Sequence, residues 1–140
     1  MLKDSCLFCK ILRKEVSFYK VYEDSDVLAF LDIHPCAKGH TVVIPKQHYE
    51  SLKDMSDSEW RDFMRGLNAA RNRIEQVLAP EGLNAGINER AAAGQAVPHV
   101  HWHIIPRWEG DGGGSMHSII KAPKEAIDVP EVAMMFTDGI

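Results

Sequence analysis

Short runs of apolar and alternating residues recur along this chain, separated by polar or proline-containing turns. Such runs are typical of strands, whose side chains point alternately to the two faces of a sheet. We predict five strands, at 18–23, 27–31, 41–44, 83–88 and 99–105. Asp24, Ser25 and Asp26 separate the first two and indicate a hairpin turn. Pro106 is expected to end the fifth strand.

One long segment has a helical period instead. Ser56 and Glu59 form the pattern of a capping box, which marks the start of a helix. Apolar residues then recur every three or four positions until Pro80 and Gly82, which predicts a long amphipathic helix covering one face of the sheet. They are Trp60, Phe63, Met64, Leu67, Ile74, Val77 and Leu78. Strands followed by a helix and then more strands indicate an α+β domain with an antiparallel sheet.

Composition narrows the classes of protein that fit. The 140 residues are enough for one compact domain, and the net charge of −4 without a basic stripe argues against a nucleic-acid partner. No apolar stretch reaches 18 residues and residues 1–9 do not resemble a signal peptide, so we expect no membrane partner and a cytoplasmic location. The odd count of three cysteines argues against a disulfide framework.

The last predicted strand carries the candidate chemistry. Its residues alternate between three histidines (His99, His101, His103) and three apolar side chains (Val100, Trp102, Ile104). In a strand, the imidazoles would share one face while the apolar side chains pack on the helix. One imidazole can attack an electrophile while its neighbours handle protons, because its ordinary pKa is near 6.5. A half-exposed strand that happens to be rich in histidine is the competing interpretation, and three histidines on one face disfavour it.

The segment 99–105 resembles the signature of the histidine triad (HIT) family, in which three histidines alternate with apolar residues. The resemblance extends from about Cys6 to Gly114 and includes 32–35, 39–46, Asn88, Gly94-Gln95 and Pro106-Arg107. It implies a HIT-like fold: an antiparallel sheet of about five strands, a long amphipathic helix and a short N-terminal helix. Residues 1–114 would form the HIT domain, and 115–140 a C-terminal tail that completes the domain or a homodimer.

The resemblance also implies a role for each matching residue. His101 would attack the α-phosphorus of a nucleotide and form a covalent nucleotidyl-histidine, which water then hydrolyses. A backbone carbonyl near the first histidine would accept its other ring N–H. His103 and His40 would line the phosphate and assist the leaving group, and which of the two donates a proton stays open.

Three further positions would bind the nucleotide. The resemblance implies that Gln95 contacts the phosphate and the leaving atom, that Asn88 holds the α-phosphate and that Asp32 binds the ribose hydroxyls. A carboxylate accepts two hydroxyl hydrogen bonds well, although Asp32 could equally be a turn residue. Ala96 departs from the family pattern, in which Ser or Thr is common, so we expect a slower or more selective enzyme.

Two cysteines near the N-terminus point to a metal. Cys6 and Cys9 have the C-x2-C spacing of zinc ligands, and the alternatives are two buried cysteines or a redox motif, the latter disfavoured because no parallel βαβ unit follows. The resemblance implies that His48 and His99 complete a structural zinc site and leave His101 free of metal. Cys36 has no partner in this scheme, and we take its side chain to be incidental.

The expected function is that of a nucleotide hydrolase or transferase, which cleaves purine nucleotide conjugates at the α-phosphate and releases nucleoside monophosphate, as a phosphoramidase does. Alternatives are a dinucleoside polyphosphate hydrolase, a nucleotide-binding protein with little turnover, and a hydrolase that uses an open zinc site. The resemblance further implies a homodimer.

Overall fold

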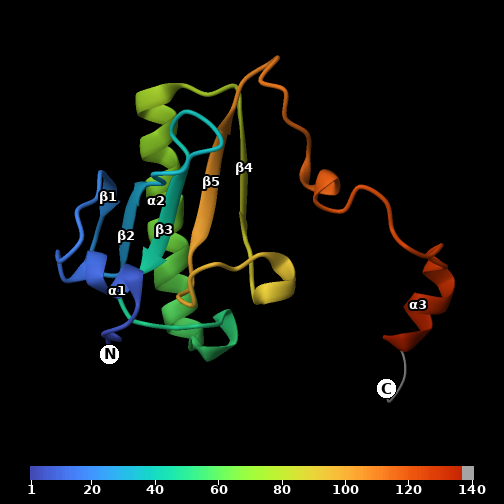
Figure 1. The fold of residues 1–140 in the computed structure, drawn as a ribbon, viewed down its shortest axis with the longest axis horizontal. Coiled ribbons are helices and arrows are strands. Elements are labelled where there is room, and N and C mark those ends of the chain that lie inside the picture. The colour runs from blue at the N-terminus through green and yellow to red at the C-terminus, as the bar shows by residue number, and fades with distance from the viewer. Residues whose placement is uncertain (137–140) are drawn as a thin grey trace.

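A computed structural model describes residues 1–136 of the chain (Figure 1). Its sheet has five strands: β1 Lys20–Glu23, β2 Val27–Leu31, β3 Thr41–Pro45, β4 Gly82–Ile87 and β5 Trp102–Arg107. They lie in the order β1-β2-β3-β5-β4, and every neighbouring pair is antiparallel. The α+β class and the antiparallel sheet predicted from the sequence are confirmed.

The long helix α2, Asp57–Leu78, covers one face of this sheet (Figure 1). Both bonds of the predicted capping box at Ser56 and Glu59 are present, and the helix ends at Ala79 in the left-handed conformation. Its buried face packs on alternate residues of the strands, among them Val27, Ala29, Val43 and Ile104, and on Val100 just before β5. A Cβ at Gly66 would collide with the Val27 side chain, so the helix can approach β2 this closely only with glycine there.

A short N-terminal helix, α1 Leu7–Leu12, contributes to a second apolar cluster with the other side chains of β2 and β3. The strand residues of this cluster are Leu28, Phe30, Val42 and Ile44. The central strands are therefore buried on both faces, because α2 covers one set of side chains and α1 the other. This packing brings α1, with Cys6 before it, onto the sheet beside the histidine segment.

The fifth strand differs from its prediction at both ends. It begins at Trp102 rather than at His99, because the Val100 N–H donates to the Tyr49 carbonyl oxygen at 2.7 Å instead of pairing in the sheet. It also continues past Pro106 to Arg107. Pairing with β3 ends at Ile104, so the missing N–H of Pro106 interrupts no bond on that side. The remaining strand boundaries lie within two residues of those predicted.

The other described elements are short: the 3-10 helices η1 Leu52–Asp54, η2 Ala91–Ala93 and η3 Met116–Ile119, and the helix α3 Val129–Met135. Residues 115–136 are all exposed. Figure 1 shows this segment, which includes α3, extending away from the sheet. The predicted tail 115–140 thus falls largely on this segment, and its last four residues lie outside the described part. Within residues 1–136 no helix is both long and apolar enough to cross a membrane.

Candidate functional site

The triad histidines His99 and His101 precede β5, His103 lies within it, and the three divide between two clusters. Val100 and Ile104 are buried against α2, whereas the rings of His99 and His101 both contact the ring of Phe8 in α1. The two histidine side chains therefore lie on the opposite side of this segment from Val100 and Ile104, as the alternation predicts. His99 belongs to a cluster with Cys6, and His101 to one with His103, whose ring centroid lies 5.1 Å away.

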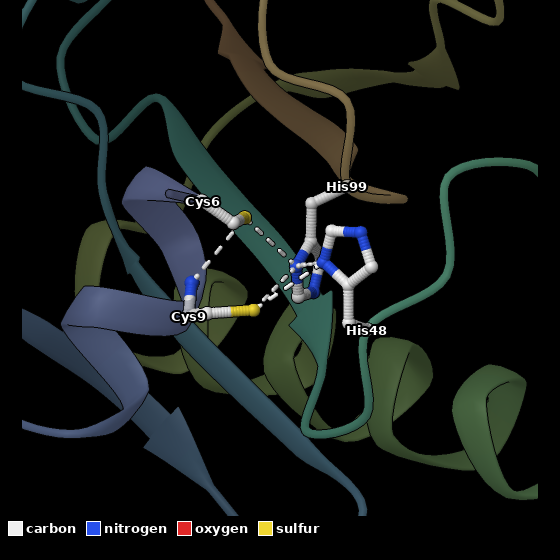
Figure 2. A group of neighbouring side chains, drawn as sticks. All are labelled: Cys6, Cys9, His48 and His99. Carbon is white, nitrogen blue, oxygen red and sulfur yellow. Dashed lines mark hydrogen bonds between the residues drawn. The ribbon is translucent and has the colours of Figure 1, made fainter. Parts of the chain in front are cut away.

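In the first cluster, the side chains of Cys6, Cys9, His48 and His99 point toward one another (Figure 2). The Nδ1 atoms of the two histidines are 3.2 Å apart. The Cys9 Sγ lies 3.3 Å from the Nδ1 of His48 and 3.6 Å from that of His99. The Cys6 Sγ lies 3.4 Å from the His99 Nδ1. These four residues, drawn from three distant parts of the sequence, could hold a metal ion.

The separations fit a tetrahedral zinc ion. Zinc binds thiolate sulfur at about 2.3 Å and imidazole nitrogen at about 2.05 Å, which places two nitrogens about 3.3 Å apart and a nitrogen and a sulfur about 3.6 Å apart. The observed separations of 3.2 Å and of 3.3 to 3.6 Å are close to these values. With two thiols and two imidazoles, the cluster matches the donor set of a closed structural zinc site.

The His99 nitrogen that faces this cluster is also in the form a metal needs. The His99 Nε2 lies 3.1 Å from the carbonyl oxygen of Pro45, which can only accept, so the Nε2 carries the proton and the Nδ1 has a lone pair. Burial lowers the pKa of His99 to about 4, so the ring is neutral at pH 7. Burial also raises the pKa of the Cys9 thiol, a cost that a bound cation would offset.

His48 completes the set from the segment after β3. Its Nδ1 faces the cluster, and its buried Nε2 has no hydrogen-bond partner among residues 1–136. The carboxylate of Glu50 lies 3.8 Å from that Nε2. A carboxylate beside the outer nitrogen of a metal-binding histidine is a common arrangement, because it favours the tautomer that leaves the inner nitrogen free.

The second cluster is centred on His101, which is only 5% exposed. Its Nδ1 donates to the carbonyl oxygen of His99 at 2.8 Å, which leaves the Nε2 without a proton in the neutral ring. Burial lowers the pKa of His101 below its ordinary value, so the neutral form prevails at pH 7. The resulting imidazole has one free lone pair, which is what a nucleophile requires.

His103 lies beside it, and His40 and Asp32 lie next to His103. The His40 Nε2 is 2.9 Å from the His103 Nδ1 and 3.6 Å from a carboxylate oxygen of Asp32. Burial is the main cause that lowers the pKa of His40 and brings that of His103 to about 4, while Asp32 opposes the shift in both. The three also bring metal-type ligand atoms within 4.8 Å of one another.

The remaining residues singled out from the sequence are Asn88, Gln95 and Ala96. Asn88 lines the same pocket as His40 and His103, a cavity of about 950 Å³ that continues along β4 and β5 to Arg107 and Trp108. The Gln95 side chain instead bonds within its surroundings, to the Arg90 N–H and to the Glu50 and Val97 carbonyls. Ala96 is exposed in the same loop.

Some groups at the two clusters were not singled out from the sequence. Phe8 contacts the rings of both His99 and His101, with centroids 5.8 and 5.1 Å away, and so lies where the two clusters meet. Its place between the two cysteines of the C-x2-C motif was the available signal. The Pro45 carbonyl and the Cys36 N–H, which bonds the Nδ1 of His40 at 3.2 Å, are backbone groups, and residue types gave no indication of them.

Similarity to known proteins extends over most of the chain. A family model described as "HIT domain" matches residues 13–110. An uncharacterized HIT-like protein of Methanocaldococcus jannaschii is 50% identical over 107 residues, which are 76% of this chain and 82% of that protein. Adenosine 5'-monophosphoramidase of Schizosaccharomyces pombe is 39% identical over 103 residues, 74% of each chain. The crystal structure of a HIT family member from Bacillus subtilis superimposes with a TM-score of 0.79 at 35% identity and covers 98% of each chain.

Proposed function

Because this chain belongs to the histidine triad (HIT) family, we propose that it hydrolyses purine nucleotide conjugates at the α-phosphate, with His101 as the nucleophile. The observation that carries the proposal is the state of His101: its Nδ1–H is taken up by the His99 carbonyl, and its Nε2 is free. The name of the Schizosaccharomyces pombe relative, adenosine 5'-monophosphoramidase, supports an adenosine phosphoramidate as the substrate class.

In the first step, the lone pair of the His101 Nε2 attacks the α-phosphorus. A nitrogen–phosphorus bond forms, the bond to the leaving group breaks, and its electron pair stays with the leaving group, which takes up a proton. The bond from Nδ1–H to the His99 carbonyl stabilises the positive charge that develops on the ring. The product is a nucleotidyl-histidine.

In the second step, water attacks the same phosphorus. The bond to the His101 Nε2 breaks, the ring regains its lone pair, and nucleoside monophosphate and a proton are released. His103 lies beside His101, where it would contact the phosphate oxygens and assist the leaving group, and His40, which bonds His103, would act there through it. Splitting the displacement into two steps replaces one difficult attack by water with two easier attacks.

Asp32, Asn88 and Gln95 are proposed to position the nucleotide. Asp32 would accept the ribose hydroxyls, and Asn88 lines the pocket beside His103, where the α-phosphate would bind. For Gln95 to contact the phosphate, its amide would exchange a bond that it now makes to a carbonyl of Glu50 or Val97. Its backbone could make the contact without that exchange.

Cys6, Cys9, His48 and His99 are proposed to hold a structural zinc ion. When bound, zinc would supply a cross-link between α1, the segment after β3 and the residues before β5, with no open position for catalysis. The His99 carbonyl that orients His101 belongs to one of these four residues. The cluster therefore supports the nucleophile through the backbone and not through direct contact.

A homodimer is proposed from the exposed C-terminal segment. Residues 115–136 present many large apolar side chains to solvent, including Ile119, Ile120 and Phe136 at 69 to 80% exposure. Apolar segments this exposed are rare on monomers and mark contacts with another chain. A mass measurement in solution that gives a monomer would contradict the homodimer and leave the proposed chemistry intact.

The proposed activity is tested by a release assay with two matched substrates, an adenosine phosphoramidate and a diadenosine polyphosphate. We expect AMP release that is faster from the phosphoramidate, and a radiolabelled α-phosphate trapped on His101 when the reaction is quenched. Faster cleavage of the diadenosine compound would assign the chain to the dinucleoside polyphosphate hydrolases. Tight binding of AMP without release from either substrate would indicate a binding protein with little turnover.

A further inference from the structure

The backbone N–H of Cys36 contacts the second cluster, where it donates to the Nδ1 of His40 at 3.2 Å. A backbone N–H has no lone pair, so it can only donate, and the Nδ1 of His40 must be the unprotonated nitrogen. A neutral His40 then carries its proton on Nε2. That Nε2 lies 2.9 Å from the Nδ1 of His103.

The same reasoning extends by one ring. Since the His40 Nε2–H is the donor, the His103 Nδ1 is the acceptor, and a neutral His103 carries its proton on Nε2. We infer that the Cys36 backbone amide is a positioning group that fixes the tautomers of His40 and, through it, of His103, so that the Nε2–H of His103 is the hydrogen-bond donor left for the substrate. No described residue bonds that Nε2.

The arrangement also disfavours a charged ring at either position. A proton on the His40 Nδ1 would face the Cys36 N–H, and a proton on the His103 Nδ1 would face the His40 N–H. Burial lowers the pKa of both rings in the same direction, and the nearby Asp32 carboxylate opposes this without reversing it. Both rings are therefore neutral at pH 7.

The consequence for the reaction rests on the proposed function. His40 uses its single N–H on His103, so it has none to give to a leaving group. If a neutral His103 gave up its own Nε2 proton completely, it would become an anionic ring, since His40 cannot replace that proton without the same penalty. His103 thus donates a hydrogen bond to a phosphate oxygen or to the leaving atom, and the leaving group takes its proton from water.

The fixed tautomers also affect whether Asp32, His40 and His103 can bind a metal ion. Metal binding by the His40 Nε2 would require its proton to move to Nδ1, against the Cys36 amide. The Asp32, His40 and His103 group is therefore built for hydrogen bonding rather than for a cation. The first cluster has the opposite arrangement, because the Pro45 carbonyl leaves a lone pair on His99 that faces the other ligands.

NMR of protein labelled with ¹⁵N in its histidine side chains tests this inference without any substrate, because the ring nitrogens report which of them is protonated. At pH 7 we expect His40 and His103 to be neutral, each with its proton on Nε2. A wild-type spectrum with His40 protonated on Nδ1, or charged, would overturn the inference and leave the proposed function of His101 untouched. That spectrum is decisive even if no variant folds.

Two substitutions at one position isolate the amide. Cys36→Pro removes the N–H, and Cys36→Ser keeps it while changing the side chain by one atom. We expect the His40 proton to spread to Nδ1 in Cys36→Pro only, with a kcat about tenfold below that of Cys36→Ser, as for the loss of one hydrogen bond, and with little change in KM. Unchanged tautomers in a folded Cys36→Pro protein would refute the positioning role.

Discussion

His99 and His101 are two residues apart, are both buried and touch the same phenylalanine ring, yet their free nitrogens face different surroundings. The Nδ1 of His99 faces two cysteines and a second histidine, all buried or half-buried. The Nε2 of His101 has no bonded partner in the described chain. In both rings a backbone carbonyl takes the other N–H, that of Pro45 for His99 and that of His99 for His101.

This comparison shows that the backbone, rather than the residue type, distinguishes the two uses of histidine. One carbonyl bonds Nε2 and directs Nδ1 into a closed set of ligands, while the other bonds Nδ1 and leaves Nε2 free. A closed set of two thiolate sulfurs and two imidazole nitrogens favours a structural metal. A free nitrogen beside His103, with His40 next to that ring, favours reaction with a substrate.

The largest expected effect comes from His101→Ala, which should separate chemistry from stability. Loss of the nucleophile should lower kcat by at least about a thousandfold, as for other covalent catalysts. The cluster of Cys6, Cys9, His48 and His99 stays intact, so zinc content should match the wild type. The measurements are AMP release and metal analysis of the same preparation. Wild-type turnover in this variant would remove His101 from the mechanism.

The next effect is on stability, from Cys9→Ser. A thiolate ligand is lost from a site that joins three parts of the chain, so Tm should fall by at least about 10 °C in zinc-loaded protein. Cys36→Ser is the matched control, because Cys36 is exposed and outside the cluster, and its Tm should not move. Thermal unfolding with and without a chelator measures both.

The same chelation experiment separates a structural from a catalytic metal. If a chelator stops AMP release while the protein remains folded, the open-zinc mechanism is favoured over attack by His101. If release continues until the protein unfolds, the metal serves the fold alone.

The next expected effect is on the pH dependence of the reaction, which is set by His101. Attack requires a neutral His101, and burial lowers the pKa of that ring, so the neutral form persists below the ordinary histidine value near 6.5. As pH falls through the lowered pKa, the Nε2 gains a proton and kcat/KM should fall about tenfold per pH unit. The acid limb measured at constant zinc should therefore lie below pH 6.5. A limb above that value would mean that a nearby negative charge outweighs burial.

Much of this arrangement follows from the sequence. The period of the apolar residues predicts the strands and α2, and the capping box fixes where α2 begins. The alternation from His99 to Ile104 predicts which side chains enter the core. The start of β5 was predicted three residues early, because nothing in the residue types announces that the Val100 N–H bonds Tyr49 instead of a strand.

The tautomers could not be predicted for a related reason. They depend on the Pro45 carbonyl and the Cys36 N–H, and every residue offers such groups whatever its side chain. Only the fold brings Pro45 beside a histidine 54 positions away. The tail illustrates a further limit, since the resemblance leaves open whether it completes the domain or a homodimer, and in the single chain its apolar residues are exposed.

The smallest expected effect is a gain, from Ala96→Ser. The family resemblance implies that a hydroxyl here can bond the phosphate or the leaving group, and Ala96 is exposed, so a serine fits without disturbing the core. One added hydrogen bond in the transition state should raise kcat about threefold, near the lower end of what such bonds contribute. Ala93→Ser, an exposed alanine of the same loop, is the control and should leave kcat unchanged. A rise in kcat for Ala96→Ser alone would show that the loop before the triad also contributes to the reaction. Equal kcat values in both variants would indicate that the chemistry depends on the histidines alone, whose hydrogen bonds to the backbone already determine which ring nitrogens are free.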